Sequence, residues 1–293
     1  MTGALSGATI DVARPAPESG GRPGRVRRQK PRNTLTPGAG LGLGIAMLWF
    51  SLLVLVPLSA IVATAAAGGW ENYVNVLQDP QTWNALKLTV SQAALVTVIN
   101  VFMGTVIAWV LVRDKFPGKA VMNVIIDIPF ALPTVVAGLV LLALYGPNSP
   151  IGVHWAFTSK SVALALAFVT LPFVVRAVQP VLEELEADVE EAAASLGANR
   201  WTIFRRILLP SLFPAIAAGA ALSFARAISE YGSLVLLSGN RPNETEVASV
   251  RMLSFIENGS YASAAAIASV MLAVALFVIV VLDIVQRRVS RRG

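Results

Sequence analysis

Residues 183–210 read EELEADVEEAAASLGANRWTIFRRILLP and form the one long polar segment between hydrophobic runs of this chain. Glu and Ala, which dominate its first part, are strong helix formers. Gly197 is expected to end that helix, because glycine readily adopts the left-handed conformation of a helix C-cap. Asn199 can cap a second short helix, which we expect to end before Pro210, since the residue before a proline disfavours the α region. The segment therefore predicts two short helices joined by a bend.

This bend has two interpretations on the residues alone. Trp201, Phe204 and Leu208 follow helical spacing and give the second helix an apolar stripe. The small alanines of the first helix would let another protein approach closely, so the pair suits docking into a groove on a partner. An ordinary helical loop between membrane spans is the alternative.

Composition places the chain among membrane proteins. Of 293 residues, 55% are hydrophobic and 14% are charged, with a mean hydropathy of +0.68, whereas soluble domains average about 25% charged residues. The net charge of +6 does not indicate nucleic acid, because the basic residues sit in short blocks between apolar runs, as in membrane topology. No nucleic-acid partner is predicted.

Six apolar runs approach or exceed the roughly 20 residues that a spanning helix needs. They cover residues 41–67, 85–112, 121–145, 161–180, 212–237 and 261–285. The expected fold is an all-α membrane protein with six transmembrane helices. Internal prolines mark kinks rather than helix ends, and the helices kinked at Pro129, Pro133 and Pro172 are candidates for moving parts.

Both ends of the chain are basic. Residues 1–38 are rich in Pro, Gly and Arg and predict a disordered cytoplasmic arm that lies against anionic lipid. Residues 287–293 predict a basic cytoplasmic tail. With the N-terminus inside, 17 of the 23 Lys and Arg residues fall in cytoplasmic segments. The positive-inside rule then places both termini and residues 183–210 in the cytoplasm.

Three loops are expected on the opposite side. The loop at 68–84 carries Trp70, Tyr73 and Trp83, which suit interfacial anchors. The loop at 146–160 is rich in turn residues. The loop at 238–260 is the longest, and a solvated connector is favoured there over a contact with a partner.

The sequence offers no machinery for catalysis. It has no Cys and a single His, His154, in a predicted loop, so neither a hydrolytic triad nor a metal site is predicted. No GxxxxGK[ST] phosphate loop is present. We therefore expect no catalytic residues and no cofactor in this chain. Any energy for mechanical work must come from another subunit.

Charged side chains inside the apolar runs are the remaining signal, because each is costly in a membrane unless it is paired or hydrated. Arg226 and Glu230 lie four residues apart on one helix face. They predict either an internal salt bridge or a contribution to a translocation path, and both alternatives stay open. Gly232 would allow a bend or a close helix contact beside them. Asp127 and Arg176, at similar estimated depth in neighbouring spans, form a candidate charge pair.

The polar segment also resembles a family motif. Glu191-Ala192-Ala193, Gly197 after three residues, and Ile207-x-Leu209-Pro210 after nine more match the EAA loop of ABC importer permeases. The resemblance implies the type I ABC importer permease fold, with a permease domain at 83–286 that follows a first transmembrane helix and outer loop at 39–82. It implies ATPase coupling through Glu191, Ala192, Ala193, Gly197, Ile207, Leu209 and Pro210.

Three further segments narrow the family. Residues 130–134 (FALPT), 170–180 (TLPFVVRAVQP) and 224–233 (FARAISEYGS) are similar to the T-type sulfate/thiosulfate permeases. Molybdate and tungstate permeases share the third in outline, usually with Gly where Ser229 stands and Phe where Tyr231 stands. A molybdate or tungstate permease is therefore the alternative. An intramembrane enzyme and a structural anchor are the competing classes.

Membership of this family would define the surroundings of the chain. The resemblance implies a multi-pass subunit of the bacterial cytoplasmic (inner) membrane. Its partners would be a second, W-type permease, a dimer of ABC ATPases that binds ATP and Mg, and an extracytoplasmic sulfate-binding protein.

Overall fold

The structure is a computed structural model that describes residues 37–185 and 187–290, and every regular element in those ranges is a helix. The all-α fold expected from the apolar runs is therefore confirmed. The predicted basic arm at 1–38 lies almost wholly outside the described residues. The chain divides into two compact units, Met1–Ser51 and Leu52–Gly293.

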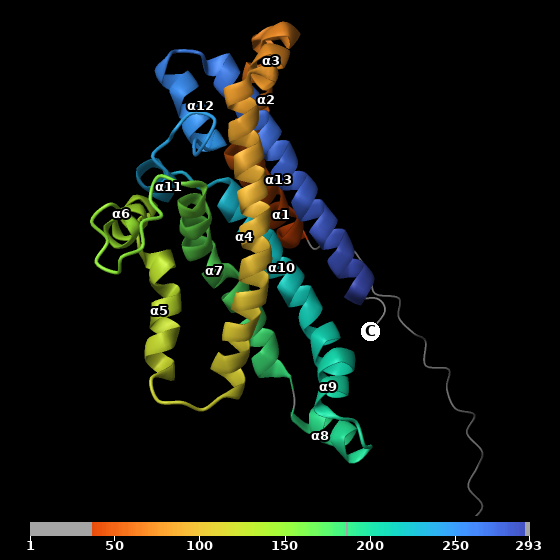
Figure 1. Ribbon diagram of the computed structural model, residues 1–293. Coiled ribbons are helices and arrows are strands. Elements are labelled where there is room, and N and C mark those ends of the chain that lie inside the picture. Colours follow the sequence, from red (N-terminus) through yellow and green to blue (C-terminus); the bar gives the residue numbers. More distant parts are fainter. Residues whose placement is uncertain (1–36, 186, 291–293) are drawn as a thin grey trace, which may run out of the picture. The chain divides into compact units, whose positions relative to one another are not determined.

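The first unit contains helix α1 (Pro37–Phe50), whose large apolar side chains are exposed. The π-helical turn Ser51–Leu55 follows it. The second unit holds the remaining helices (Figure 1), which are α2 (Val56–Ala67), α3 (Gly69–Gln78), α4 (Pro80–Arg113), α5 (Lys119–Ala131), α6 (Thr134–Tyr145), α7 (Ser159–Glu184), α8 (Ala187–Ser195), α9 (Arg200–Ile203), the π-helical turn Phe204–Leu208, α10 (Leu209–Ile228), α11 (Gly232–Leu237), α12 (Ala248–Glu257) and α13 (Tyr261–Ser290).

Five helical stretches in the described residues are long and apolar enough to cross a membrane: Gly38–Ala67, Pro80–Arg113, Ser159–Glu184, Arg200–Ile228 and Tyr261–Arg288. They correspond to five of the six predicted spans. A sixth results only if α5 and α6 together count as one span. The last helix runs to Ser290, so the first part of the predicted tail at 287–293 is helical.

The prediction of one continuous third span over 121–145 is wrong. The chain bends by 115° between helices α5 and α6. Leu132 is extended, with φ −84° and ψ 134°, and Pro133 follows it at the start of α6. A proline lacks an N–H donor and pushes the preceding residue out of the α region, so the break forms there. Pro129, by contrast, sits inside α5 without ending it.

Helix α7 is the centre of the second unit and packs against α4 and α10 (Figure 1). Val174 on α7 lies at the closest approach. A methyl group on Gly104 of α4 would come within 2.9 Å of Val174 Cβ, and one on Gly219 of α10 within 3.0 Å of Val174 Cα. These small residues let three helices pack closely, as membrane helices commonly do.

The predicted outer loop at 68–84 is largely helical, and the loop at 238–260 contains a helix that packs against the bundle, so the expectation of a solvated connector at 238–260 is wrong. Helix α3 occupies most of the first loop, and α4 begins at Pro80 rather than at residue 85. Helix α12 occupies part of the other loop and packs against α4 and α13. Polar contacts fasten this segment to the start of α4: Gln81 to Glu246 (2.7 Å), Asn84 to Asn243 (3.0 Å) and the Ala248 N–H to Thr89 Oγ1 (2.8 Å).

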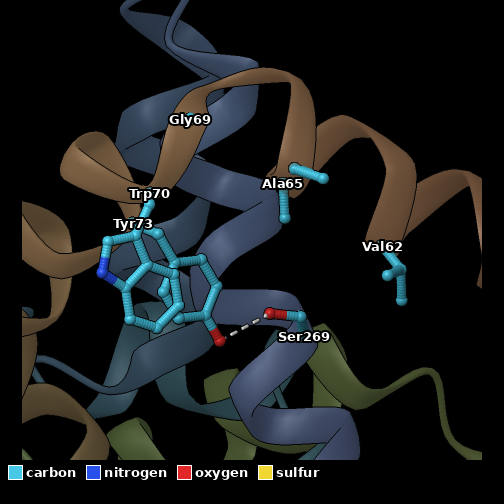
Figure 2. Close-up of a pocket in the computed structure, with 7 residues that line it drawn as sticks. Val62, Ala65, Gly69, Trp70, Tyr73 and Ser269 are labelled. Carbon is cyan, nitrogen blue, oxygen red and sulfur yellow. Dashed lines mark hydrogen bonds between the residues drawn. The ribbon is translucent and has the colours of Figure 1, made fainter.

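A cavity of about 450 Å³ lies beside α3. Trp70 and Tyr73 of α3 stack with their ring centroids 5.8 Å apart, and Tyr73 Oη lies 3.2 Å from Ser269 Oγ of α13. Figure 2 shows both rings beside this contact, with Val62 and Ala65 of α2 on the other side. Trp70 is 79% exposed, as expected for an aromatic residue at a membrane surface.

Asp79 caps the start of α4 and joins it to α12. Its carboxylate accepts hydrogen bonds from the Thr82 N–H and hydroxyl, both at 2.9 Å, and pairs with Arg251 at 3.0 Å. Burial is the largest single influence on the pKa of Asp79 and raises it. The two Thr82 hydrogen bonds and the Arg251 charge together outweigh burial, so the pKa is lowered from its ordinary value of 3.8. The stabilisation is therefore present at neutral pH and is lost as the pH falls below about 4.

Replacing Asp79 with Ala should lower the free energy of unfolding by about 1–2 kcal/mol, because the helix cap and the Arg251 pair are both lost. Thermal unfolding of the detergent-solubilised protein at pH 7 measures this, and the difference should shrink below about pH 4. Asp114→Ala is the matched control, since Asp114 is exposed at the other end of α4. Equal shifts for both variants would contradict the capping role of Asp79.

Candidate functional site

The predicted bend is present as an elbow, which we define as residues 187–203. Gly197 has φ +85° and ends α8 in the left-handed conformation, as predicted. The Gly197 N–H donates to the Ala194 carbonyl at 2.9 Å and the Ala198 N–H to the Ala193 carbonyl at 3.1 Å. This pair of hydrogen bonds is a Schellman motif, which satisfies the last carbonyls of the helix.

The second half of the bend begins as predicted but does not end as predicted. Asn199 Oδ1 accepts a hydrogen bond from the Thr202 N–H at 2.8 Å and so caps α9. The expectation that this helix stops before Pro210 is wrong, because the helical stretch continues from Arg200 to Ile228. The Leu209 N–H bonds to the Phe204 carbonyl, five residues back. This wider π turn lies where the ring of Pro210 would otherwise crowd the preceding turn.

The motif residues fall into two groups. Glu191, Ala192 and Gly197 are exposed and Ala193 is half-buried, at the end of the unit away from α3 and α12 (Figure 1). Leu196, beside them, is 89% exposed. The other group, which is Ile207, Leu209 and Pro210, lies where the elbow joins α10. The first group is thus free to contact another protein, and the second is part of a helix that enters the bundle.

An ion pair that the sequence analysis missed holds the elbow to α4. Arg113 at the end of α4 pairs with Glu190 of α8 at 2.5 Å, and its guanidinium lies 5.6 Å from the centroid of the Trp109 ring. The Phe204 ring meets Trp109 edge-on, and Trp201 stacks on Phe204. Nothing in the sequence indicates that Arg113 reaches a helix more than seventy positions away.

Arg226 and Glu230 form a salt bridge of 2.8 Å, in which the Glu230 side chain is 1% exposed and the Arg226 side chain 30%. The other carboxylate oxygen of Glu230 accepts from the Ser233 N–H and hydroxyl, both at 2.9 Å. Glu230 therefore accepts the hydrogen bonds of a backbone N–H and a hydroxyl in the first turn of α11. This arrangement is the internal salt bridge, one of the two alternatives that the sequence left open. Because Arg226 is partly exposed, its guanidinium also remains accessible to solvent.

The predicted fifth span at 212–237 is interrupted at this carboxylate, so one continuous helix there is wrong. Helix α10 ends at Ile228 and α11 begins at Gly232. A Cβ on Gly232 would lie 2.1 Å from Thr134 Oγ1, and one on Gly138 2.7 Å from the Ser233 carbonyl oxygen. The break between α10 and α11 thus packs against the start of α6, and α6 itself begins at the break between α5 and α6. Only glycines permit this approach.

The structure also brings Asp127 and Arg176 together. The guanidinium donates to both carboxylate oxygens, from Nε at 2.8 Å and from Nη2 at 2.6 Å. It also contacts the Asn123 side chain and carbonyl and the Gln179 side chain, at 2.6–3.2 Å. The two side chains remain 48% and 31% exposed. A half-exposed polar network of this kind would be costly against lipid, so another protein surface or water must cover it.

Comparisons with known proteins agree with this geometry. Residues 100–292 match the family described as "Binding-protein-dependent transport system inner membrane component". The sulfate transport system permease protein CysT of Escherichia coli strain K12 is 42% identical over 264 residues, which cover 87% of this chain and 95% of that protein. The protein of the same name from Synechocystis sp. is 38% identical over 250 residues, or 83% and 87% of the two chains.

A solved structure shares the fold. It is a bacterial alginate ABC transporter in complex with an alginate pentasaccharide-bound periplasmic protein, and one of its chains superposes with a TM-score of 0.70 at 19% identity. The superposition covers 85% of this chain and 94% of the other. The expected ABC importer permease fold is confirmed.

Replacing Arg226 with Met should lower the free energy of unfolding by about 3 kcal/mol, because it leaves the buried Glu230 charge without its partner. The double variant Arg226→Met/Glu230→Gln should recover part of this loss, since a Gln oxygen can still accept from the Ser233 N–H. Thermal unfolding in detergent measures both. The control is Arg287→Met, which breaks the exposed pair with Asp283 at the same four-residue spacing and should change stability little. A double variant less stable than Arg226→Met alone would refute the pairing.

Proposed function

This chain belongs to the family of binding-protein-dependent transport system inner membrane components, and on that premise we propose that it is the permease subunit of an ATP-driven ABC importer for sulfate. It is a multi-pass membrane protein and a transport subunit rather than an enzyme, because its relatives are permeases and a separate ATPase hydrolyses ATP. The assignment of sulfate as the substrate rests on the 42% identity to a sulfate permease over 87% of the chain.

The elbow is proposed to be the contact with the ATPase. Its apex, residues 191–197, is largely exposed and ends in a Schellman turn, so a partner can reach Glu191, Ala192, Ala193 and Gly197. Ile207, Leu209 and Pro210 would transmit the contact, since they join the elbow to α10. The excess of Lys and Arg on this side supports a cytoplasmic elbow and cytoplasmic termini. ATP and Mg would be bound by the ATPase and not by this chain.

The geometry supports alternating access by rigid-body movement. One helical stretch, Arg200–Ile228, connects the elbow to the Arg226–Glu230 pair. A pull on the elbow would therefore displace the region where α10, α11 and α6 pack. Two-state coupling of this kind needs a partner that binds one state better than the other. The ATPase dimer, fixed to the elbow, would supply that preference.

Three residues, Arg226, Glu230 and Gly232, are proposed for the translocation path. Arg226 is the one most suited to meet an anion, because it is partly exposed while its partner Glu230 is buried and held by α11. Gly232 would allow the close contact that shapes this part of the path.

The Asp127–Arg176 pair lies on a half-exposed face of α5 and α7, which the second, W-type permease would cover. An extracytoplasmic sulfate-binding protein would deliver the anion from the other side, and the membrane that this chain spans would be the bacterial inner membrane.

Uptake of radiolabelled sulfate tests the substrate. A strain that lacks its own permease and is complemented with this chain and its partner subunits should accumulate sulfate, and excess molybdate should compete poorly. Thiosulfate is the second competitor. Stronger competition by molybdate than by unlabelled sulfate would favour the molybdate alternative and overturn the sulfate assignment.

Replacing Gly197 with Leu should reduce sulfate uptake at least tenfold, because a large side chain at the apex would prevent close approach of the ATPase. The matched control is Gly259→Leu, since Gly259 ends α12 in the same left-handed Schellman turn, with φ +75° and open space around it. Both variants carry a similar backbone strain of about 1 kcal/mol, but only one lies in the elbow. Uptake and substrate-stimulated ATP hydrolysis are measured together. Equal loss in both variants would refute a coupling role for the apex.

A further inference from the structure

A second cavity, of about 350 Å³, opens where the elbow joins the bundle. It lies between the last turns of α4 and the helical stretch that begins at Arg200. Its wall is mostly apolar, and the hydroxyl of Thr105 is buried without a hydrogen-bond partner among the described residues. The lining residues are Thr105, Val106, Trp109, Trp201 and Phe204.

Three aromatic rings shape this cavity. Phe204 contacts Trp109 edge-on at 5.8 Å and Trp201 by stacking at 5.7 Å. Trp201 nevertheless stays 67% exposed. A large aromatic surface left open in this way needs an apolar occupant, because burial of a Trp side chain is among the larger contributions to binding.

The position of the cavity indicates a membrane surface. The stretches Pro80–Arg113 and Arg200–Ile228 are both long enough to span, and the cavity lies at the end of one and the beginning of the other. Tryptophan is enriched at that level of a bilayer, where the apolar chains meet the headgroups.

A basic group borders the cavity. Arg200, Arg205 and Arg206 are exposed, and none has an acidic partner among the residues that the structure describes. Arg205 is four residues from Trp201, and Arg200 is four residues from Phe204, so both share a helix face with the aromatic wall. Arg113, the other arginine at this level, is already paired with Glu190. The carboxylates of Asp188 and Glu191 lie on α8, beyond the Gly197 turn.

We propose that this cavity binds an anionic phospholipid, with an acyl chain against the aromatic wall and its phosphate against Arg200 and Arg205. The apolar wall has nothing to offer a free anion, and the unpaired arginines have nothing to offer an uncharged lipid. Both features together fit an anionic headgroup on an acyl chain. Because the occupant would touch Trp109 of α4 and Trp201 of the elbow at once, the bound lipid would also stabilise the seating of the elbow on α4.

Fluorescence quenching by brominated lipid tests the site. The complete transporter is placed in nanodiscs that contain brominated phosphatidylglycerol or brominated phosphatidylcholine at matched mole fractions. The difference between the wild type and Trp201→Phe isolates the signal of this ring from the other five tryptophans of the chain. Phosphatidylglycerol should quench Trp201 at a lower mole fraction than phosphatidylcholine does. Arg200→Gln/Arg205→Gln should weaken that preference about 25-fold, at about fivefold for each charge removed.

The control is Arg287→Gln/Arg288→Gln, which removes two charges near the end of α13, away from the cavity, and should leave the preference unchanged. All these substitutions are at exposed positions, and thermal unfolding checks that each variant is folded. Equal quenching by the two lipids would overturn the proposal. Absence of Trp201 quenching by either lipid in the complete transporter would overturn it too, because the ATPase would then occupy this surface. Sulfate uptake is not a readout, so the result is independent of the proposed substrate.

Discussion

The arrangement of the broken helices depends on one buried carboxylate. A charge within an apolar slab is tolerated only if it is paired and its remaining oxygen is satisfied. Glu230 meets both conditions, because one oxygen pairs with Arg226 of α10 and the other accepts from the Ser233 N–H and hydroxyl at the start of α11. The same group therefore ends one helix, begins the next and neutralises a cation. An interruption at this depth is stable only because its backbone groups find such partners.

The second interruption is built differently and packs close to the first. At Leu132 and Pro133 the covalent chemistry of proline breaks the helix, and no side-chain cap is needed. Gly138 and Gly232 then let α6 and α11 approach to backbone distance. A tightly packed pair of breaks cannot deform gradually, because any added volume meets backbone. Packed contacts of this kind favour discrete states over continuous bending, which is what a transport cycle with two states requires.

The elbow shows the opposite design. Its apex makes few contacts within the described chain, while its base is held by the Arg113–Glu190 pair and by a cluster of aromatic rings. A partner at the apex can therefore pull without disrupting the fold. The continuous stretch from Arg200 to Ile228 would carry the displacement to the Glu230 carboxylate. The apex carries mostly small side chains, and the contacts that attach the elbow to the rest of the chain are at its base.

The sequence by itself determined the class of protein, most of the spans and the local geometry of the elbow. Apolar run length, the left-handed Gly197 and the Asn199 cap are local properties, so they can be read without a fold. The sequence also placed Arg226 with Glu230 and suggested Asp127 with Arg176, because charges in apolar runs must find partners. It could not show the break at residues 229–231, since the Ser233 cap and the Gly232–Thr134 contact exist only after α10, α11 and α6 have packed. The sequence also did not show that the helix continues through Pro210, where a π turn accommodates the proline. Nor did it show the partner of Arg113, which lies far along the chain. Tertiary structure decided these points because each depends on atoms from distant segments that periodicity and propensity do not describe.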